Sequence, residues 1–140
     1  MHVQTYLFYN GRCQEALDFY KQAIGAEVVF LMHYNESPEP CGPLPEGFES
    51  KIMHASFRVG DAELMASDGN STSPAKFDGF SLSLRFKTAE QAERAFNALA
   101  DGGQVHVPLM TTFFSPKFGM LTDRFGAPWM VLVESANQGC

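Results

Sequence analysis

Apolar residues recur three or four positions apart in two stretches of the chain, near residues 12–24 and 88–101, and this period predicts an amphipathic helix in each. The inward stripes are expected to be Cys13, Ala16, Leu17, Tyr20 and Ile24 in the first helix and Ala92, Phe96 and Leu99 in the second. Gly25 ends the first pattern, and Thr88 with Gln91 provides a capping box at the start of the second.

Apolar, aromatic and β-branched runs bounded by turn residues predict strands around both helices. They are expected at 3–9, 27–33, 51–59, 63–67, 80–86, 104–110, 119–122 and 128–133. Each half of the chain then reads as a strand, a helix and three further strands. One helix for every four strands disfavours a doubly wound parallel sheet, so we predict an α+β fold of two similar βαβββ modules.

The segment 36–49 has a different character from the rest of the chain. It holds four of the eight prolines together with four glutamates. Because proline cannot donate to a strand ladder, this composition excludes a central strand and predicts an exposed, mobile, acidic insertion rather than a domain boundary.

The composition is that of a chain that can bury a core, with 140 residues of which 45% are hydrophobic. Ten basic against 16 acidic side chains give a net charge of −6, so no nucleic-acid partner is expected. No apolar run reaches the roughly 18 residues that cross a bilayer, and no signal-peptide pattern opens the sequence, so we expect a cytoplasmic protein with no membrane partner. Cys13, Cys41 and Cys140 are too few and too widely spaced for a disulfide framework, and reduced thiols are expected.

Three phrases of the sequence carry a family resemblance: YLFYNGRCQEALDFYKQAIGAE, IMHASFRVGDAELMASD and PLMTTFFSPKFGMLTDRFGAPWMVLVE. Together with the repeated βαβββ order, they resemble the PhnB-like, glyoxalase-related branch of the vicinal oxygen chelate superfamily. The resemblance implies a single glyoxalase-like domain over 1–140, made of modules at about 1–70 and 78–136. It also implies a half-open curved barrel, a small-molecule cavity inside it, and a homodimer. Members of this branch have carried the label demethylubiquinone methyltransferase, but no GxGxxG turn for a nucleotide-like cofactor occurs here, and no cofactor is predicted.

Metal-dependent members of the superfamily bind a divalent ion through His, Glu or Gln on the first and last strands of each module. Counting along this chain, the corresponding positions fall at Thr5, Ser81 and Met130, with the fourth near Leu64 or Met65. Hydroxyl and thioether groups are poor ligands for Zn²⁺, Ni²⁺ or Fe²⁺. We therefore predict that the usual metal site is absent, although an unusual set built from His54 with Glu63 or Asp68 stays open.

Candidate cavity residues each have a structural alternative. His54 lies within a predicted strand and could be hydrogen-bonded in the sheet or contact a ligand, whereas His2, His33 and His106 are expected at the surface. Asp68 could open a turn or act as a base at the cavity mouth.

The remaining candidates are aromatic or hydroxyl side chains. Trp129, Phe113 and Phe114 could fill the core or line the cavity. The small hydroxyl side chains of Thr5 and Ser81 would leave room on the concave face.

Three functions remain open from the sequence. The first is a small-molecule binding protein or enzyme that works without a metal. The second is a metal-dependent lyase, isomerase or dioxygenase-type enzyme with an unusual ligand set. The third is a dimeric binding protein with no chemistry of its own. Because a fold does not fix a function, the ligand cannot be named from these residues.

Overall fold

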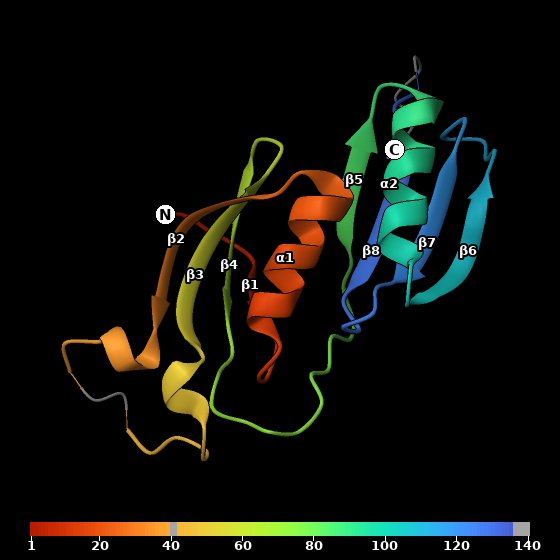
Figure 1. Ribbon diagram of the computed structural model, residues 1–140. Helices are drawn as coiled ribbons and strands as arrows, with labels where there is room; N and C mark the ends of the chain where they lie inside the picture. The colour runs from red at the N-terminus through yellow and green to blue at the C-terminus, as the bar shows by residue number, and fades with distance from the viewer. Residues whose placement is uncertain (40–41, 136–140) are drawn as a thin grey trace. The chain divides into compact units, whose positions relative to one another are not determined.

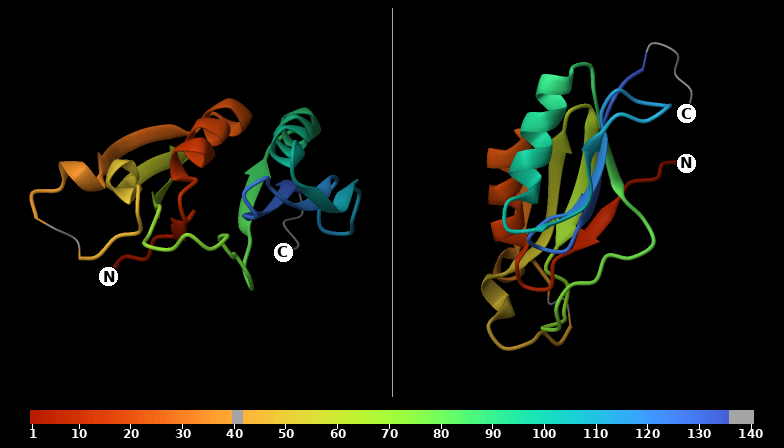
Figure 2. Two further views of the ribbon diagram at one scale, coloured as in Figure 1. Left: turned by 60° about the horizontal axis from the view of Figure 1, so that its bottom comes forward. Right: turned by 90° about the vertical axis from the view of Figure 1, so that its right-hand side faces the viewer.

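The computed structural model describes residues 1–39 and 42–135 (Figure 1). The chain divides into two compact units, Met1–Ala75 (unit 1) and Lys76–Cys140 (unit 2). Over the residues described, each unit has one α-helix on one side of a four-stranded mixed sheet (Figure 2). The predicted α+β class and the repeated βαβββ order are confirmed, whereas the barrel combining both sheets stays a prediction.

Unit 1 consists of β1 (Tyr6–Phe8), α1 (Cys13–Ile24), β2 (Glu27–His33), β3 (Ile52–Val59) and β4 (Ala62–Ser67). Its strands lie in the order β1-β4-β3-β2, with β1 parallel to β4 and the other pairs antiparallel. Unit 2 consists of β5 (Leu82–Phe86), α2 (Ala89–Ala100), β6 (Gln104–Met110), β7 (Phe118–Thr122) and β8 (Pro128–Val133). Its order β5-β8-β7-β6 repeats the same topology.

The core of unit 1 lies between α1 and one face of its sheet. Leu7 and Tyr9 are 2% and 1% exposed, and they alternate with the far more exposed Tyr6 and Phe8. The hydroxyl groups of Tyr9 and Tyr20 are 2.9 Å apart, so the two buried phenols satisfy each other. The face of the sheet opposite α1, to which Tyr6 and Phe8 belong, is called the open face below.

Helix α1 begins without a local cap, because the side chain of the N-cap residue Arg12 makes no capping hydrogen bond. The carboxylate of Asp68, which follows β4, accepts from the Cys13 and Gly11 amides instead, at 2.8 and 2.9 Å. Its second oxygen accepts from the Ile52 amide at 2.8 Å. One buried anion therefore ties together the first turn of α1, the start of β3 and the end of β4, where it also complements the helix dipole.

The core of unit 2 has the same plan. Thr88 caps α2 by accepting from the Gln91 amide, as predicted. Trp129 is buried, and its Nε1 donates to Asp123 at 2.8 Å. Gly119 in β7 lies so close to the Phe96 ring that a Cβ there would be 2.6 Å from it.

The first strand of each unit is shorter than the sequence predicts, and residues 80–81 are not part of β5. Residues 3–5 are not part of β1, and the Gln4 side chain donates to the Glu63 carbonyl at 3.2 Å. The insertion 36–49 forms no strand in its described residues, as predicted. It is not wholly exposed, however, because Phe48 is buried against Gly11.

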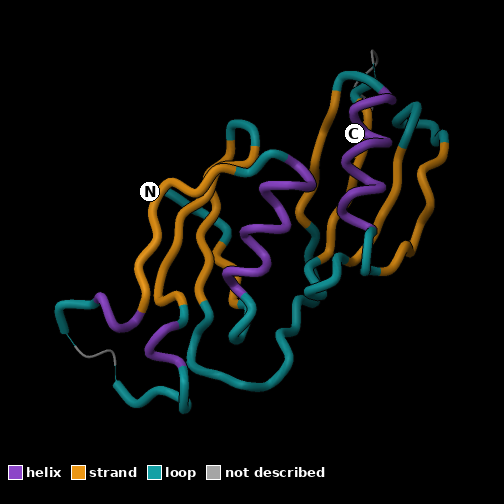
Figure 3. Tube along the Cα trace, in the orientation of Figure 1, coloured by secondary structure: helices purple, strands orange, loops and turns teal. Residues whose placement is uncertain are grey.

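The insertion is flanked by two short 3₁₀ turns, η1 (Tyr34–Glu36) and η2 (Phe48–Ser50), seen in Figure 3. Cys41 and Cys140 lie outside the described residues. Of the helices in the described part of the chain, none is long and apolar enough to span a membrane.

Candidate functional site

On the open face of unit 1, the aromatic side chains of β1 are paired across the sheet with residues of β4. The ladder places Tyr6 opposite Met65 and Phe8 opposite Ser67 across β1 and β4. The rings of Tyr6 and Phe8 stack with centroids 5.0 Å apart and 23° between their planes. A flat aromatic wall therefore runs along β1 on the side of the sheet away from α1.

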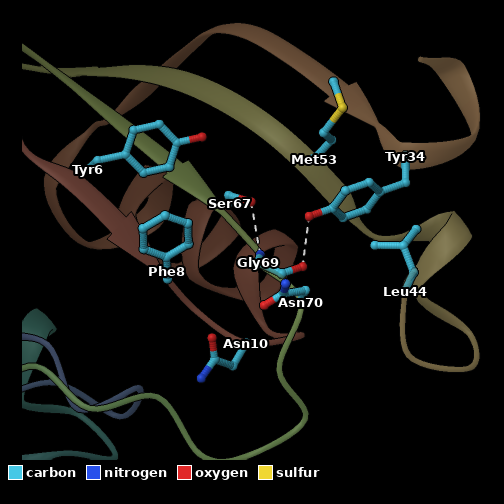
Figure 4. Close-up of a pocket in the computed structure, with 9 residues that line it drawn as sticks. All are labelled: Tyr6, Phe8, Asn10, Tyr34, Leu44, Met53, Ser67, Gly69 and Asn70. Atoms are coloured by element: carbon cyan, nitrogen blue, oxygen red, sulfur yellow. Dashed lines mark hydrogen bonds between the residues drawn. The ribbon is translucent and has the colours of Figure 1, made fainter. Parts of the chain in front are cut away.

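A cavity of about 440 Å³ borders this wall at the carboxyl end of β1 (Figure 4). It is lined by Tyr6, Phe8, Asn10, Tyr34, Leu44, Met53, Ser67, Gly69 and Asn70. Tyr34 and Leu44 come from η1 and the insertion, so the acidic segment contributes one side of the cavity. The volume falls within the range known for small-molecule sites.

Tyr6 and His54 form a side-chain pair on the open face. The Tyr6 hydroxyl lies 2.8 Å from His54 Nδ1, and their ring centroids are 5.5 Å apart. The Phe30 ring covers the other side of His54 at 6.0 Å. Partial burial raises the pKa of Tyr6, and a hydrogen bond with Ser67 opposes that rise, so the phenol stays protonated at neutral pH.

Several predicted cavity residues have structural contacts. The Asp68 carboxylate is 1% exposed and is bound by three backbone amides. Trp129 lies in the core of unit 2 with its indole donating to Asp123. Both residues therefore have the structural role that was the alternative to lining a cavity, because their polar atoms are hydrogen-bonded within the protein.

Thr5 is not among the residues that line the unit 1 cavity, and Phe113 and Phe114 belong to unit 2. Thr5 precedes β1 and uses its carbonyl to accept from the Met65 amide. Phe113 is 93% exposed and makes an edge contact with Phe114 in the loop after β6. The strand position that faces the cavity is Tyr6, one residue beyond the position obtained by counting.

Ser81 and Met130 belong to unit 2. Met130 pairs with Ser83 across β5 and β8, on the face opposite the buried Trp129 and Val131. Met130 therefore lies on the open face of unit 2, which is the face of its sheet opposite the buried Trp129 and Val131. Ser81 lies one residue before β5.

The other histidines and Cys13 have the environments that their positions suggested. His2 and His106 are exposed, and His33 is half-buried beside Glu36. Cys13 is fully buried, and this burial raises the pKa of its thiol, with the Asp68 carboxylate adding to the effect. A protonated, inaccessible thiol is a core residue rather than a nucleophile.

The donor groups on the open faces do not fit the divalent metal that the superfamily resemblance implies. In unit 1 the paired positions on the first and last strands hold a phenol, Tyr6, and a thioether, Met65. Within residues 1–39 and 42–135, no three His, Cys, Asp or Glu side chains gather where they could hold a metal ion. Phenol and thioether ligands do not replace the imidazole and carboxylate groups that such ions select.

Sequence reasoning missed most of the cavity lining, including Tyr6, Phe8, Tyr34 and Met53. The sequence signal that could have located the cavity face of β1 was the apolar stripe of α1, because this stripe must pack on one face of the sheet. Both faces of that strand are apolar, however, so alternation could not show which face α1 covers. Tyr34 and Leu44 reach the cavity through loop geometry, for which the sequence held no periodic signal.

Solved structures share this architecture. The fosfomycin resistance protein FosX from Listeria monocytogenes aligns over 100% of this chain and 98% of its own, with 9% identity and a TM-score of 0.68. At that identity the likeness concerns the fold alone. Two βαβββ units with their helices on one side of each sheet are similar to the glyoxalase-like fold of the vicinal oxygen chelate class.

Closer relatives identify the branch. A sequence model of the 3-demethylubiquinone-9 3-methyltransferase family matches residues 1–132. Protein YjdN from Escherichia coli (strain K12) is 31% identical over 140 residues, 95% of each chain. Protein PA1353 from Pseudomonas aeruginosa is 43% identical over 96% of this chain and 98% of its own, with a TM-score of 0.83. The PhnB protein from Bacillus cereus is 30% identical over 95% and 99%, with a TM-score of 0.80. The chain belongs to this PhnB-like family.

Proposed function

We propose that the protein binds a small organic molecule in the unit 1 cavity without a metal ion. The observation that carries this proposal is the cavity of about 440 Å³, which borders the stacked Tyr6 and Phe8 rings. Stacked rings beside a few polar groups favour a flat, largely apolar ligand. The poor metal donors at the paired positions of β1 and β4 support metal-free binding.

The binding test uses 4-nitrotoluene, a planar apolar probe, with the full ¹⁵N-labelled chain. The amides of Phe8, Tyr34 and Gly69, which border the cavity, should shift in the NMR spectrum as the probe is added. Phe8→Ala should weaken binding by about two- to tenfold, the worth of one aromatic contact. Phe113→Ala serves as the matched control, because that ring is exposed and does not line the cavity. Unmoved cavity amides would contradict the proposal.

Metal-dependent lyase, isomerase or dioxygenase-type chemistry is the competing function. It predicts stoichiometric metal in the purified protein and a melting temperature that rises when Zn²⁺, Ni²⁺, Fe²⁺ or Mn²⁺ is added. Elemental analysis and melting curves should instead show neither. A metal-induced rise that His54→Ala abolishes would decide for the competing function.

The family description names methyl transfer, so that activity has its own test. Methyl transfer requires a bound methyl donor, and a donor that binds the native state would raise the melting temperature. Our proposal expects no such rise with S-adenosylmethionine, and measurable methylation of a catechol or demethylubiquinone analogue would contradict it.

We also propose a homodimer. Edge strands of both sheets expose apolar side chains, with Phe30 of β2 at 47% and Met110 of β6 at 50%. Exposed apolar edges invite pairing with a second chain. A dimeric mass should appear in sedimentation at micromolar concentration, and a monomer would refute this assembly.

A further inference from the structure

Most polar side chains that line the unit 1 cavity are hydrogen-bonded to the backbone around it. The Tyr34 hydroxyl donates to the Gly69 carbonyl at 2.7 Å, and Ser67 Oγ accepts from the Gly69 amide at 2.9 Å (Figure 4). The Asn10 side-chain amide donates to the Ser73 carbonyl at 3.0 Å. These bonds hold the cavity wall in place, so the groups that make them have a structural role.

Tyr6 and Asn70 are the other polar side chains of the cavity. The Tyr6 hydroxyl is bonded to His54 Nδ1 at 2.8 Å and also to Ser67. The Asn70 carboxamide differs, because it makes no hydrogen bond within the described part of the chain. A carboxamide carries an acceptor oxygen and an NH₂ donor side by side. Both groups of Asn70 are therefore available to a ligand in the cavity.

Asn70 lies close to the aromatic side of the cavity. It follows Gly69 in the turn after β4, and a Cβ on Gly69 would lie 3.3 Å from Phe8 Cδ1. The Phe8 ring therefore lies against the backbone one residue before Asn70. This ring stacks on Tyr6 but is 51% exposed, so it still has surface to offer a ligand. A planar ligand on Phe8 can thus present its edge to the Asn70 side chain.

The lining of the cavity also limits the charge of the ligand. No Lys, Arg, Asp or Glu is among the residues that line the cavity as described. A charged ligand would lose part of its hydration there without an opposite charge to balance it, which is costly. The cavity therefore favours an uncharged ligand.

We infer that Asn70 determines the specificity of the cavity and selects a planar, uncharged lactam through two parallel hydrogen bonds. A lactam carries an N–H beside its carbonyl, so its edge complements that of a carboxamide. Asn pairs in this way with the edge of adenine, which also has a donor beside an acceptor. A ligand with a lone carbonyl would satisfy only the NH₂ group of Asn70. This inference rests on the proposed function, since it concerns the same cavity.

The test compares 2-quinolone, a planar uncharged lactam, with N-methyl-2-quinolone, which lacks the N–H. Titration calorimetry on the full chain should show 2-quinolone binding about three- to tenfold more tightly, the worth of one hydrogen bond. Asn70→Leu should make the two affinities equal, because it removes both carboxamide groups. Asn70→Gln, which keeps the carboxamide on a longer side chain, should retain part of the preference.

Asn97→Leu is the matched control, because it removes an exposed carboxamide from α2 of unit 2 and should keep the full preference. If the methyl group merely lacks room in the cavity, Asn70→Leu will keep the preference too, and the inference fails. It also fails if the native chain binds 4-nitrotoluene but does not prefer 2-quinolone; the proposed function then stands. If the native chain binds neither 4-nitrotoluene nor the quinolones, both fail. Should Asn70→Leu not fold, Asn70→Ala decides.

Discussion

Replacing Asp68 by alanine should destabilise unit 1 more than any ordinary surface change. The substitution leaves three amide groups, those of Gly11, Cys13 and Ile52, without their carboxylate acceptor. An unsatisfied buried donor costs about 1–3 kcal/mol, and losing the negative charge at the start of α1 adds about 0.3–1 kcal/mol.

Two features move the expected cost towards the lower part of that range. The hydrogen bond from the Gly11 amide to Asp68 is only partly buried. A small pocket of about 160 Å³ beside Asp68 could also admit water to the freed amides. We therefore expect Asp68→Ala to lower the free energy of unfolding by about 4 kcal/mol, out of the roughly 5–15 kcal/mol typical of a domain. Asp68→Asn keeps one acceptor oxygen but turns a donor towards an amide, and should cost about 1–3 kcal/mol.

Urea denaturation followed by far-UV circular dichroism measures these losses. Trp129 is the single tryptophan and lies in unit 2, so its fluorescence gives a separate signal for that unit. Asp18→Ala is the matched control, because this exposed helix carboxylate accepts from the Gln14 side chain and should cost below about 0.5 kcal/mol. A cost below about 1 kcal/mol for Asp68→Ala would show that the amides find other partners and would refute the reasoning.

Three further substitutions or labels test other contacts. Gly103→Ala should cost at least about 1–3 kcal/mol in urea denaturation, because a Cβ would collide with the Thr122 carbonyl; an unchanged midpoint would contradict this. Trp129→Phe should cost about 2–4 kcal/mol through lost volume and the lost bond to Asp123, and wild-type stability would refute it. Burial raises the pKa of Cys13, so iodoacetamide should label it only as fast as α1 opens, whereas labelling that accelerates with alkaline pH would show an accessible thiol.

The elements were predictable because their signals are local. The strands at 27–33, 104–110 and 128–133 have the bounds expected from composition and turns, and each helix lies within a residue of its predicted ends. The Thr88 cap, whose side chain accepts from the Gln91 amide, also needs only residues three apart. Periodicity and capping act over one or two turns, which a single sequence displays directly.

The site was less predictable because it depends on contacts between distant segments. Tyr6 meets His54 across 48 residues, and Asp68 caps α1 across 55. Nothing in the run from Val3 to Tyr9 shows which alternate set faces α1, since each set is mainly apolar with one polar residue, Thr5 or Gln4. A shift of one residue in β1 therefore separates the expected Thr5 from the observed Tyr6.

The parallel pairing of β1 with β4 shapes the order of events during synthesis of the chain. β1 leaves the ribosome first, but its partner follows after α1, β2, the insertion and β3 have been made. At about 5–20 residues per second, the Tyr6–Phe8 strand waits roughly 3–12 s with its aromatic edge unpaired. β5 waits in the same way for β8. Each nascent chain therefore exposes an unpaired strand in two intervals, first β1 and later β5, to the chains on neighbouring ribosomes. Chaperone binding during these two intervals should govern how much protein is recovered in soluble form.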